Sequence, residues 1–388
     1  MTEPPALGVI RTHTGLHMRR RTKVLGTLVG LLAVGVTALG LTVSYDAACP
    51  TAAPGVATAP VIKAYRYRCY GSPKVLELVD VNKPTPADSE VLVKVHAASI
   101  NPLEWHYMRG KPYLMRISSG IGAPTNQKFG SDFAGTVESV GAAVTRFKVG
   151  DRVFGIGDGT FAEYFTIGEQ RTIAIMPDSA TFEQASGVGI AAITALQAVR
   201  DKGQVKAGQH VLINGASGGV GSFAVQIAKS YGAHVTGVAS TRNVDLVKSL
   251  GADTVIDYTK DDFTKGTQKY DVIIDMVSNH SVRKVASMLT PAGICVIVGG
   301  TNDNRWIGPG IQSLEAIVLA PIVKQTFITM LASENQRDLG VLRDLMQAGK
   351  IKAVIDRRYP MAELPAGVEY LEKGRARGKV IVNVVPMQ

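Results

Sequence analysis

The glycine-rich stretch at residues 210–228, HVLINGASGGVGSFAVQIA, constrains the fold more than any other part of this chain. It opens with the apolar run 211–213, which is typical of a strand buried on both faces, and a turn of small residues follows at once. The apolar residues after the turn are spaced at i, i+4, i+7 and i+8, as on one face of a helix: Val220, Ala224, Ile227 and Ala228. The sequence therefore predicts a strand, a tight turn and a helix in immediate succession.

The predicted turn suits a bound phosphate, because the first N–H groups of a helix have no partner inside the helix and lie at the positive end of its dipole. Gly218 and Gly221 stand at the last two glycine positions of the dinucleotide-binding fingerprint, and Ala216 stands where the first glycine usually lies. We predict that five consecutive residues bind the diphosphate of a dinucleotide: Ser217, Gly218, Gly219, Val220 and Gly221. A turn with a purely structural role is the alternative.

Strand and helix patterns alternate downstream of the turn. The predicted elements are strands at residues 234–239, 254–258, 270–276 and 294–298, and helices at residues 244–250 and 280–289. Such an alternation is typical of a doubly wound parallel sheet, in which the first glycine turn binds a nucleotide. The order of the elements therefore favours a binding role for the turn over a structural one.

The residues after the predicted strand 234–239 indicate which dinucleotide binds. NAD sites place an Asp or Glu about 20 residues beyond the glycine turn, where it binds the ribose hydroxyls and would repel a 2′-phosphate. This chain has Ser240, Thr241 and Arg242 at that place, which supply two hydroxyls and a guanidinium. The sequence therefore favours NADP(H), and the alternative is that Arg242 is an ordinary solvated residue at the start of a helix.

An uncharged apolar run at residues 24–43 follows the basic cluster RRRTK and is long enough to cross a membrane. It predicts a membrane anchor or a signal segment, preceded by a basic tail at 1–23 and followed by a linker at 44–60. The positive-inside rule then places the rest of the chain on the extracytoplasmic side, with an exported or a cytoplasmic protein as alternatives. The rest of the net charge of +10 is dispersed and lacks clustered aromatic residues, so no nucleic-acid partner is expected.

Cys49, Cys69 and Cys295 are the only cysteines among the 388 residues. They lie far apart in the sequence, so we predict neither a disulfide framework nor a zinc lobe with four cysteine ligands. Each cysteine is expected to be an ordinary small residue.

Short strand patterns with glycine at the corners precede the glycine turn, from residue 61 to about residue 180. Six motifs stand out: AASINPLEW at 97–105, GSDFAGTV at 130–137, VGDRVFG at 149–155, NGASGGVG at 214–221, SLGADTVIDY at 249–258 and RGKVIV at 377–382. With these motifs the chain resembles the medium-chain dehydrogenase/reductase superfamily, in its zinc-independent quinone oxidoreductase branch. The resemblance implies a GroES-like domain at 61–180, completed by 353–388, and a Rossmann domain at 181–352.

Two of these motifs depart from the pattern of the zinc-dependent alcohol dehydrogenases. Asn101 stands where those enzymes have a cysteine ligand, and Gly130, Ser131 and Asp132 replace a Gly-His-Glu ligand motif. A catalytic zinc ion needs about three donor side chains, so no metal site is expected. The resemblance then implies an NADPH-dependent enzyme that reduces a quinone or an α,β-unsaturated carbonyl by hydride transfer. Two rival functions are a metal-free alcohol or aldehyde dehydrogenase and a membrane-tethered NADP-binding protein with little turnover.

The resemblance also implies roles for individual residues. Asn101 and Thr194 would lie beside the nicotinamide, with Asn101 also facing the substrate carbonyl. The remaining cofactor contacts would come from Ser240, Arg242 and Tyr258 at the 2′-phosphate, and from Gly299, Arg377 and Lys379 elsewhere. Three of these residues have simpler alternatives. Asn101 can cap a turn, Thr194 can bond its own helix backbone, and Tyr258 can pack on the sheet.

Two tyrosines after Asn101 are candidate proton donors. A phenol can donate a proton, which suits Tyr107 and Tyr113, and surface packing is the alternative for both. The apolar segment at 311–330 predicts a cover over the substrate cleft or an edge in a homodimer. An apolar cover would favour a small apolar carbonyl or quinone substrate.

Overall fold

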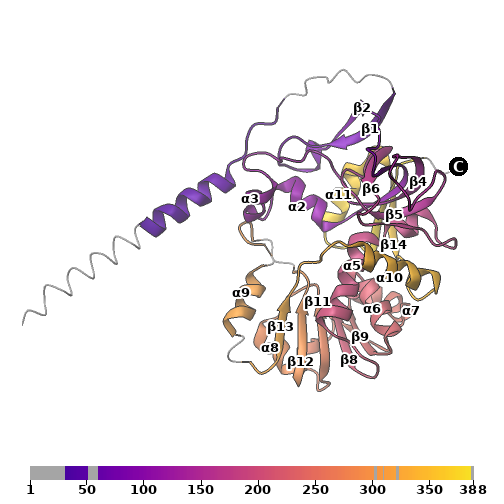
Figure 1. Ribbon diagram of the computed structural model, residues 1–388. Coiled ribbons are helices and arrows are strands. Elements are labelled where there is room, and N and C mark those ends of the chain that lie inside the picture. Colours follow the sequence, from indigo (N-terminus) through magenta and orange to yellow (C-terminus); the bar gives the residue numbers. More distant parts are fainter. Residues whose placement is uncertain (1–30, 51–59, 301–303, 309, 320–322, 386–388) are drawn as a thin grey trace, which may run out of the picture.

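The computed structural model describes residues 31–50, 60–300, 304–308, 310–319 and 323–385. This part of the chain forms two lobes, each built on its own β-sheet (Figure 1). Helices α5 (Gly189–Leu196) and α10 (Gln336–Gln347) lie where the two lobes meet (Figure 1). We call the lobe that contains the glycine turn the cofactor lobe, and the other the first lobe.

The cofactor lobe has a parallel sheet of six strands in the order β10-β9-β8-β11-β12-β13. The chain first adds strands on one side of β8 and then returns to add strands on the other side, as in a doubly wound sheet. The strands are β8 (His210–Asn214), β9 (His234–Ala239), β10 (Thr254–Asp257), β11 (Tyr270–Asp275), β12 (Leu289–Ile297) and β13 (Thr326–Thr329). The helices between them are α6 (Gly219–Ser230), α7 (Val244–Ser249), α8 (Val282–Met288) and α9 (Gly310–Leu319).

The apolar run in β8 is buried on both faces of this sheet. Val211 and Ile213 lie in one core with α6, while Leu212 between them lies in a second core with α8. Successive strand residues point to opposite faces, so a run of three apolar residues requires a cover on each side. On α6 the predicted stripe faces the first core, with Ala224 and Ile227 fully buried. The predicted Rossmann sheet is confirmed.

The first lobe has a sheet in the order β14-β15-β3-β4-β5-β7, with β6 paired to β3. Its strands are β3 (Glu90–Ile100), β4 (Asp132–Val140), β5 (Arg152–Ile156), β6 (Tyr164–Gly168), β7 (Ile173–Ile175), β14 (Ile355–Pro360) and β15 (Lys379–Asn383). A separate pair is formed by β1 (Val61–Arg66) and β2 (Glu77–Asn82). The helices are α2 (Pro102–Arg109), α3 (Arg116–Ser119), α4 (Phe182–Ser186) and α11 (Leu364–Glu372). The last strand, β15, pairs antiparallel with β3, so the end of the chain returns to this lobe.

This β-rich lobe together with the parallel sheet confirms the predicted α/β fold class, a GroES-like part and a Rossmann part. The domain boundaries at 180/181 and 352/353 stay predictions. The segment 311–330 differs in part from its predicted role as a cover. It forms α9 and then β13, which is the edge strand of the parallel sheet, and Phe327 packs against the core beneath that sheet.

The predicted membrane anchor at residues 24–43 is wrong, and with it the predicted membrane localisation. Among the described residues, no helix has the length and apolar character needed to cross a membrane. The first residues of the described helix, 31–44, extend away from both lobes (Figure 1), its last residues lie against them, and residues 24–30 lie outside the described part. The lack of charged residues in the run 24–43 does not tell where its residues lie. Val43, its last residue, is buried against the first lobe.

The prediction for two of the three cysteines is also wrong. Cys49 and Cys69 form a disulfide, with their Cα atoms 5.1 Å apart. The bond forms because residues 45–49, predicted as linker, lie against the first lobe, where Asp46 pairs with Gly122. The prediction holds only for Cys295, a free thiol buried in the core.

Candidate functional site

The glycine turn lies between β8 and α6, where the sequence predicts it. A Cβ atom on Gly221 would lie 2.8 Å from the carbonyl carbon of Gly215 and 2.9 Å from Ala216 Cα, so only glycine fits. This close approach brings the start of α6 against the end of β8, and the free N–H groups of the helix face outward. The predicted diphosphate residues before Gly221 are half-buried: Ser217, Gly218, Gly219 and Val220.

The returning end of the chain passes directly over this turn. A Cβ atom on Gly219 would lie 3.5 Å from Lys379 Cδ and 3.7 Å from the carbonyl oxygen of Gly378. The motif at 377–382 therefore belongs to the same site as the glycine turn, although the two are far apart in sequence.

A hydroxyl cluster stands beside the turn, where the adenosine 2′-phosphate was predicted. Asn243 Nδ2 donates to Ser217 Oγ at 3.0 Å and to Ser240 Oγ at 3.2 Å. Asn243 is itself buried, and its Oδ1 has no hydrogen-bond partner among the described residues. The sequence analysis missed this residue. Its only signal was its position three residues after Ser240, at the start of a helix.

Two arginines that were predicted to contact the cofactor lie on different segments of the chain. Arg242 follows Ser240 closely, and Arg377 belongs to the returning end of the chain. Arg242 is exposed and donates from Nη2 to the carbonyl oxygen of Arg375 at 2.7 Å, which ties it to the returning chain. Arg377 follows two residues later, and its buried Nε has no hydrogen-bond partner within the described ranges. A buried donor without a partner is costly. An anion such as a phosphate would satisfy it, so this part of the site fits a dinucleotide.

A carboxylate that the sequence analysis did not weigh lies nearby. Asp257, the last residue of β10, accepts hydrogen bonds from Thr241 Oγ1 at 2.6 Å and Thr259 Oγ1 at 2.7 Å. These bonds, with Thr241 first, lower the pKa of the Asp257 carboxyl to about 2, so it is charged at neutral pH. This charge is balanced by a nearby ammonium group, because Lys260 Nζ lies 3.6 Å from Asp257 Oδ2. Tyr258 beside it is 62% exposed, so it does not pack on the sheet as the alternative held.

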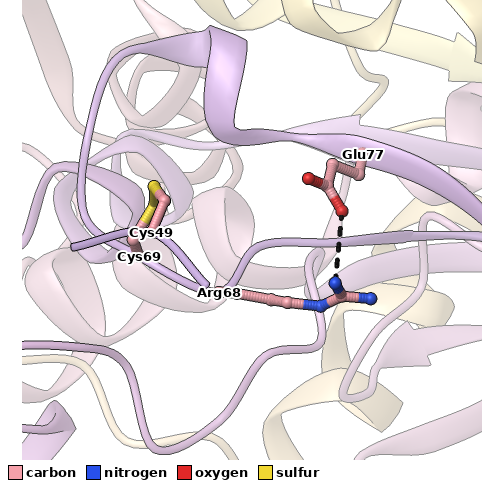
Figure 2. Close-up of a disulfide and its surroundings, with 4 residues drawn as sticks. All are labelled: Cys49, Arg68, Cys69 and Glu77. Atoms are coloured by element: carbon pink, nitrogen blue, oxygen red, sulfur yellow. Dashed lines mark ion pairs between the residues drawn. A yellow bond between two sulfur atoms is a disulfide. The ribbon is translucent and has the colours of Figure 1, made fainter. Parts of the chain in front are cut away.

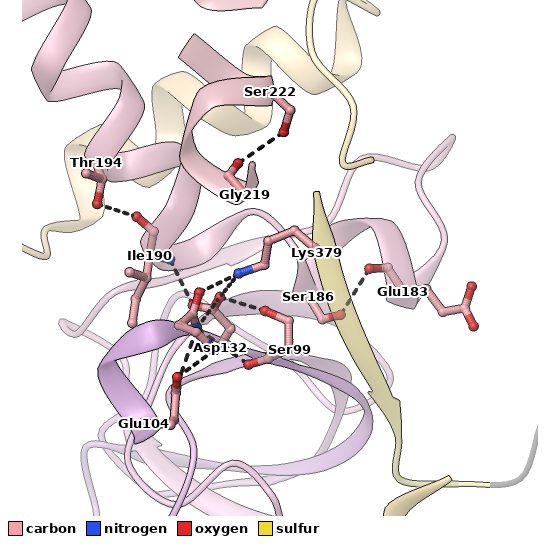
Figure 3. A network of polar contacts seen from close by, with 11 residues as sticks. Ser99, Glu104, Asp132, Glu183, Ser186, Ile190, Thr194, Gly219, Ser222 and Lys379 are labelled. Atoms are coloured by element: carbon pink, nitrogen blue, oxygen red, sulfur yellow. Dashed lines mark hydrogen bonds and ion pairs between the residues drawn. The ribbon is translucent and has the colours of Figure 1, made fainter. Parts of the chain in front are cut away.

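The second part of the site is a buried polar cluster around Asn101, whose members Glu104, Asp132 and Lys379 are labelled in Figure 3. Asn101 follows β3 and precedes α2, and its side chain is 2% exposed. Its Nδ2 donates to Asp132 Oδ2 at 3.0 Å, and its Oδ1 accepts from the Lys379 ammonium. Asp132, the first residue of β4, also accepts from Ser99 Oγ at 2.8 Å and from the backbone N–H of Ile190 at 2.8 Å. Asp132 therefore links the first lobe to the start of α5.

Glu104 joins this cluster from the first turn of α2. Its Oε2 accepts from the backbone N–H of Asn101 at 2.6 Å, so Asn101 also caps α2, as its simpler alternative held. Burial and, after it, the negative charge of Asp132 raise the pKa of the Glu104 carboxyl, and the positive charge of Lys379 opposes them, so that the pKa is about 7. The sequence analysis missed Glu104, because a glutamate in the first turn of a helix is ordinary.

The other predicted site residues lie outside the cluster. Thr194 donates its hydroxyl to the carbonyl oxygen of Ile190 at 2.7 Å, which is the bond its simpler alternative required. Tyr107 is 38% exposed on α2, and Gly299 follows β12, where its carbonyl oxygen accepts from Ser278. The predicted roles of Thr194 beside the nicotinamide, of Tyr107 as a proton donor and of Gly299 as a cofactor contact stay predictions.

The polar cluster does not fit a zinc ion. Asn101 offers an amide oxygen that already accepts from an ammonium group, and the Lys379 charge lies 3.4 Å from Asp132 Oδ2, where it would repel a metal cation. Zinc prefers His and Cys donors, and neither type is present in the cluster. Across the described ranges, no three His, Cys, Asp or Glu side chains are grouped so as to hold a metal.

Comparison with known proteins agrees with this geometry. Residues 87–178 match the family described as alcohol dehydrogenase GroES-like domain, and residues 250–382 match the one described as zinc-binding dehydrogenase. The human protein named quinone oxidoreductase is 33% identical over 337 residues, which cover 83% of this chain and 98% of that protein. This chain belongs to the medium-chain dehydrogenase/reductase superfamily. The predicted family is confirmed, and the chain is an oxidoreductase that binds a nicotinamide cofactor.

Other relatives show the range of this superfamily. The protein named 2-methylene-furan-3-one reductase from Solanum lycopersicum is 31% identical, covering 90% of this chain and 86% of its own. The structure of the quinone oxidoreductase from Coxiella burnetii has a TM-score of 0.72 and 31% identity, covering 84% of this chain and all of that one. A structure titled NAD-dependent alcohol dehydrogenase, 26% identical, has a TM-score of 0.71. Similarity to these members does not distinguish NADP from NAD, so that distinction depends on the residues of the site.

Proposed function

We propose that this chain uses NADPH to reduce a quinone or an α,β-unsaturated carbonyl compound. The observation that carries the proposal is the pairing of Asn101 with Asp132 at the positions that correspond to zinc ligands in the zinc-dependent members. Alcohol oxidation in those members relies on a metal that lowers the pKa of the bound alcohol. Reduction of an activated double bond needs only donors and positive charge near the oxygen that becomes negative. The names of the relatives from human and Solanum lycopersicum support this substrate class.

Two groups of residues would bind the cofactor. The turn at 217–221 would hold the diphosphate, and Ser240, Arg242 and Arg377 would hold the adenosine 2′-phosphate, with Tyr258 at its exposed edge. When bound, NADPH supplies the hydride that adds to the acceptor, and a proton completes the reduction. The chain itself supplies the buried polar side chains of Asn101 and Lys379, because exclusion of water strengthens electrostatic interactions there.

The activity is tested with the full-length chain and two acceptors, 9,10-phenanthrenequinone and a 2-alkenal. We expect consumption of NADPH with both, at a rate that a metal chelator does not change. Oxidation of simple alcohols with no reduction of either acceptor would favour a metal-free alcohol dehydrogenase. Cofactor binding without reduction of any acceptor would favour a binding protein with little turnover.

The cofactor preference is tested with Arg242→Ala and Arg377→Ala. Each variant removes a charged donor from the 2′-phosphate site proposed here, so we expect NADPH to bind about 10-fold more weakly while NADH binding is unchanged. Arg343→Ala is the matched control, because Arg343 is exposed on α10 and pairs only with its neighbour Asp344 in the described structure. Equal losses for NADPH and NADH would show that the two arginines do not read the 2′-phosphate.

A further inference from the structure

Lys379 lies beside Asn101 because of how two strands pair. β15 begins at Lys379, and its next residue, Val380, faces Ile100 at the end of β3. Asn101 follows Ile100 directly, so the antiparallel pairing places Lys379 next to it. The Lys379 side chain is 3% exposed, and its ammonium donates to Asn101 Oδ1 and to Asp132 Oδ2.

The charges around Asn101 set the orientation of its amide. The nitrogen Nδ2 lies 3.0 Å from Asp132 Oδ2 and 3.4 Å from Glu104 Oε1, while the oxygen faces the Lys379 ammonium. Rotating the amide by half a turn would direct its oxygen at two carboxyl groups and its nitrogen at an ammonium. Buried polar groups left without partners are costly, so the observed orientation is strongly preferred.

We propose that Lys379 is a positioning residue for the reduction described above. It holds the Asn101 amide in one orientation and keeps a positive charge beside it, while its aliphatic chain passes 3.5 Å from the Cβ position of Gly219 at the cofactor turn. One side chain thus connects the start of α6 with the polar cluster. The inference rests on the proposed function, and it adds the residue that replaces a metal as the source of positive charge.

The variant Lys379→Met removes the charge and keeps an unbranched side chain. We expect kcat for the acceptor to fall about 100-fold, as when one preorganised electrostatic contact is lost, while the Kd of NADPH changes by less than about 3-fold. Lys379→Arg keeps the charge and should restore part of kcat. An unchanged kcat in Lys379→Met, or an equal loss in Lys379→Arg, would contradict the proposal. If Lys379→Met does not fold, Asp132→Asn is added to it. The double variant then leaves no unpaired charge from the Lys379–Asp132 pair buried, and the same kcat loss is expected.

A stability cycle separates this inference from the proposed function. If the wild-type protein reduces no acceptor, the proposed function fails, and the positioning role is read from melting temperatures alone. Asn101→Ala and Lys379→Met each break the same contact, so we expect the double variant to lose less than the sum of the two single losses. Additive losses would show that Lys379 does not hold Asn101.

A second inference starts from Arg116, a buried arginine at the start of α3 that contacts the C-terminal end of α2. Arg116 is 1% exposed, and its Nε donates to the carbonyl oxygen of Gly110, the residue after α2, at 2.7 Å. The same guanidinium donates to the backbone oxygens of Val43 at 3.2 Å and Tyr45 at 2.9 Å, and pairs with Asp46 at 2.8 Å. Burying a charge requires such partners, so the N-terminal segment is part of the environment that Arg116 needs.

We call residues 43–49 the N-terminal strap, because they are held at both ends. Arg116 holds the first end, and the disulfide between Cys49 and Cys69 holds the second (Figure 2). In between, the backbone N–H of Ala47 donates to the carbonyl oxygen of Gly122 at 2.9 Å. The strap therefore lies along the loop at 110–122 from Val43 to Ala47, and its last residue is bonded to Cys69.

The loop under the strap also contacts the cofactor lobe. The backbone N–H of Tyr113 donates to the carbonyl oxygen of Arg305 at 2.8 Å, and the rings of Tyr113 and Trp306 meet edge to face at 5.2 Å. The Arg116 guanidinium lies 4.7 Å from the centre of the Tyr113 ring. Strap, loop and the segment at 304–308 thus form one continuous joint between the lobes.

We infer that the strap braces this joint and that its disulfide makes the brace sensitive to redox conditions. A dithiol reductant would transfer two electrons and two protons to the Cys49–Cys69 bond, giving two thiols and an oxidised dithiol. The covalent attachment of the strap is then lost, and only the Arg116 contacts and the backbone hydrogen bond from Ala47 to Gly122 hold the segment. The expected consequence is faster local opening of the loop at 110–122.

Hydrogen exchange followed by mass spectrometry tests this inference on the full chain. We expect reduction, or Cys49→Ser, to raise exchange about 10-fold or more at 43–49, 110–122 and 304–308. Cys295→Ser is the matched control, since Cys295 is buried away from the strap, and it should leave these rates unchanged. Free thiols at Cys49 and Cys69 without reductant, or faster exchange confined to 43–49, would overturn the inference.

Discussion

Gly189 at the start of α5 is the residue whose replacement tests the link between the lobes most directly. A Cβ atom there would lie 2.9 Å from Asp132 Cγ and 3.0 Å from Ile156 Cγ1. The Asp132 carboxylate cannot retreat, because it accepts hydrogen bonds from Ser99 and Asn101 on its other side. Gly189→Ala therefore forces the carboxylate away from its bond to the Ile190 N–H, the contact that ties β4 to α5.

The magnitude follows from three contributions. Overpacking costs about 2 kcal/mol, and loss of a hydrogen bond to a charged group costs about 2 kcal/mol. Replacing glycine by alanine in a helix returns about 1 kcal/mol. The net loss is about 3 kcal/mol, which lowers the melting temperature by roughly 5–10 °C in a lobe that unfolds as one unit.

The control is Gly340→Ala in α10, where a Cβ atom meets nothing within 4 Å. It gains the helix preference without a clash, so we expect a melting temperature equal to or slightly above that of the wild type. Thermal unfolding of both variants gives the comparison. Equal melting temperatures for Gly189→Ala and the wild type would refute the claim that Asp132 is held in place by its partners.

Two further predictions concern the two parts of the site. Gly221→Ala should abolish dinucleotide binding, measured by titration, because its Cβ would lie 2.8 Å from the carbonyl carbon of Gly215 and open the turn; retained affinity would contradict the assigned turn. Burial raises the pKa of Glu104 to about 7 in the folded protein. The protonated side chain therefore stabilises the fold fully below about pH 4.5, and this contribution of about 3 kcal/mol is lost as pH rises through about 7. The melting-temperature advantage of the wild type over Glu104→Gln should therefore shrink as pH rises, and a constant difference would rule out a titrating Glu104.

The parallel sheet could be predicted because each of its elements carries a local pattern. The apolar run in β8 needs cover on both faces, and β9 has the predicted bounds, 234–239. β12 begins five residues before the predicted strand 294–298, at Leu289, and its first half contains the half-buried Thr290 and the exposed Pro291 and Ala292. The apolar pattern that predicts strands cannot detect such residues.

The polar cluster could be predicted only as separate motifs. Asn101 and Lys379 were both expected at the site, but they lie 278 residues apart, and only the pairing of β15 with β3 brings them together. The charge of Lys379 was assigned to the cofactor, while the structure directs it at Asn101 and Asp132. Glu104 and Asn243 could not be singled out, because their only signal, a polar residue near the start of a helix, is common.

The N-terminal region shows why composition is a weak guide to where a segment lies. An apolar run after a basic cluster predicts a membrane anchor whatever follows it, because the criterion counts only the residues of the run. The strap is instead placed by backbone carbonyl groups at Val43 and Tyr45, which every residue possesses and no sequence pattern can reveal. The residue that reveals the arrangement is Arg116, a charged side chain at the start of the short helix α3 that the structure buries almost completely. Since a guanidinium is rarely buried without partners, that burial requires a segment lying over it, and the disulfide at Cys49 holds the segment there.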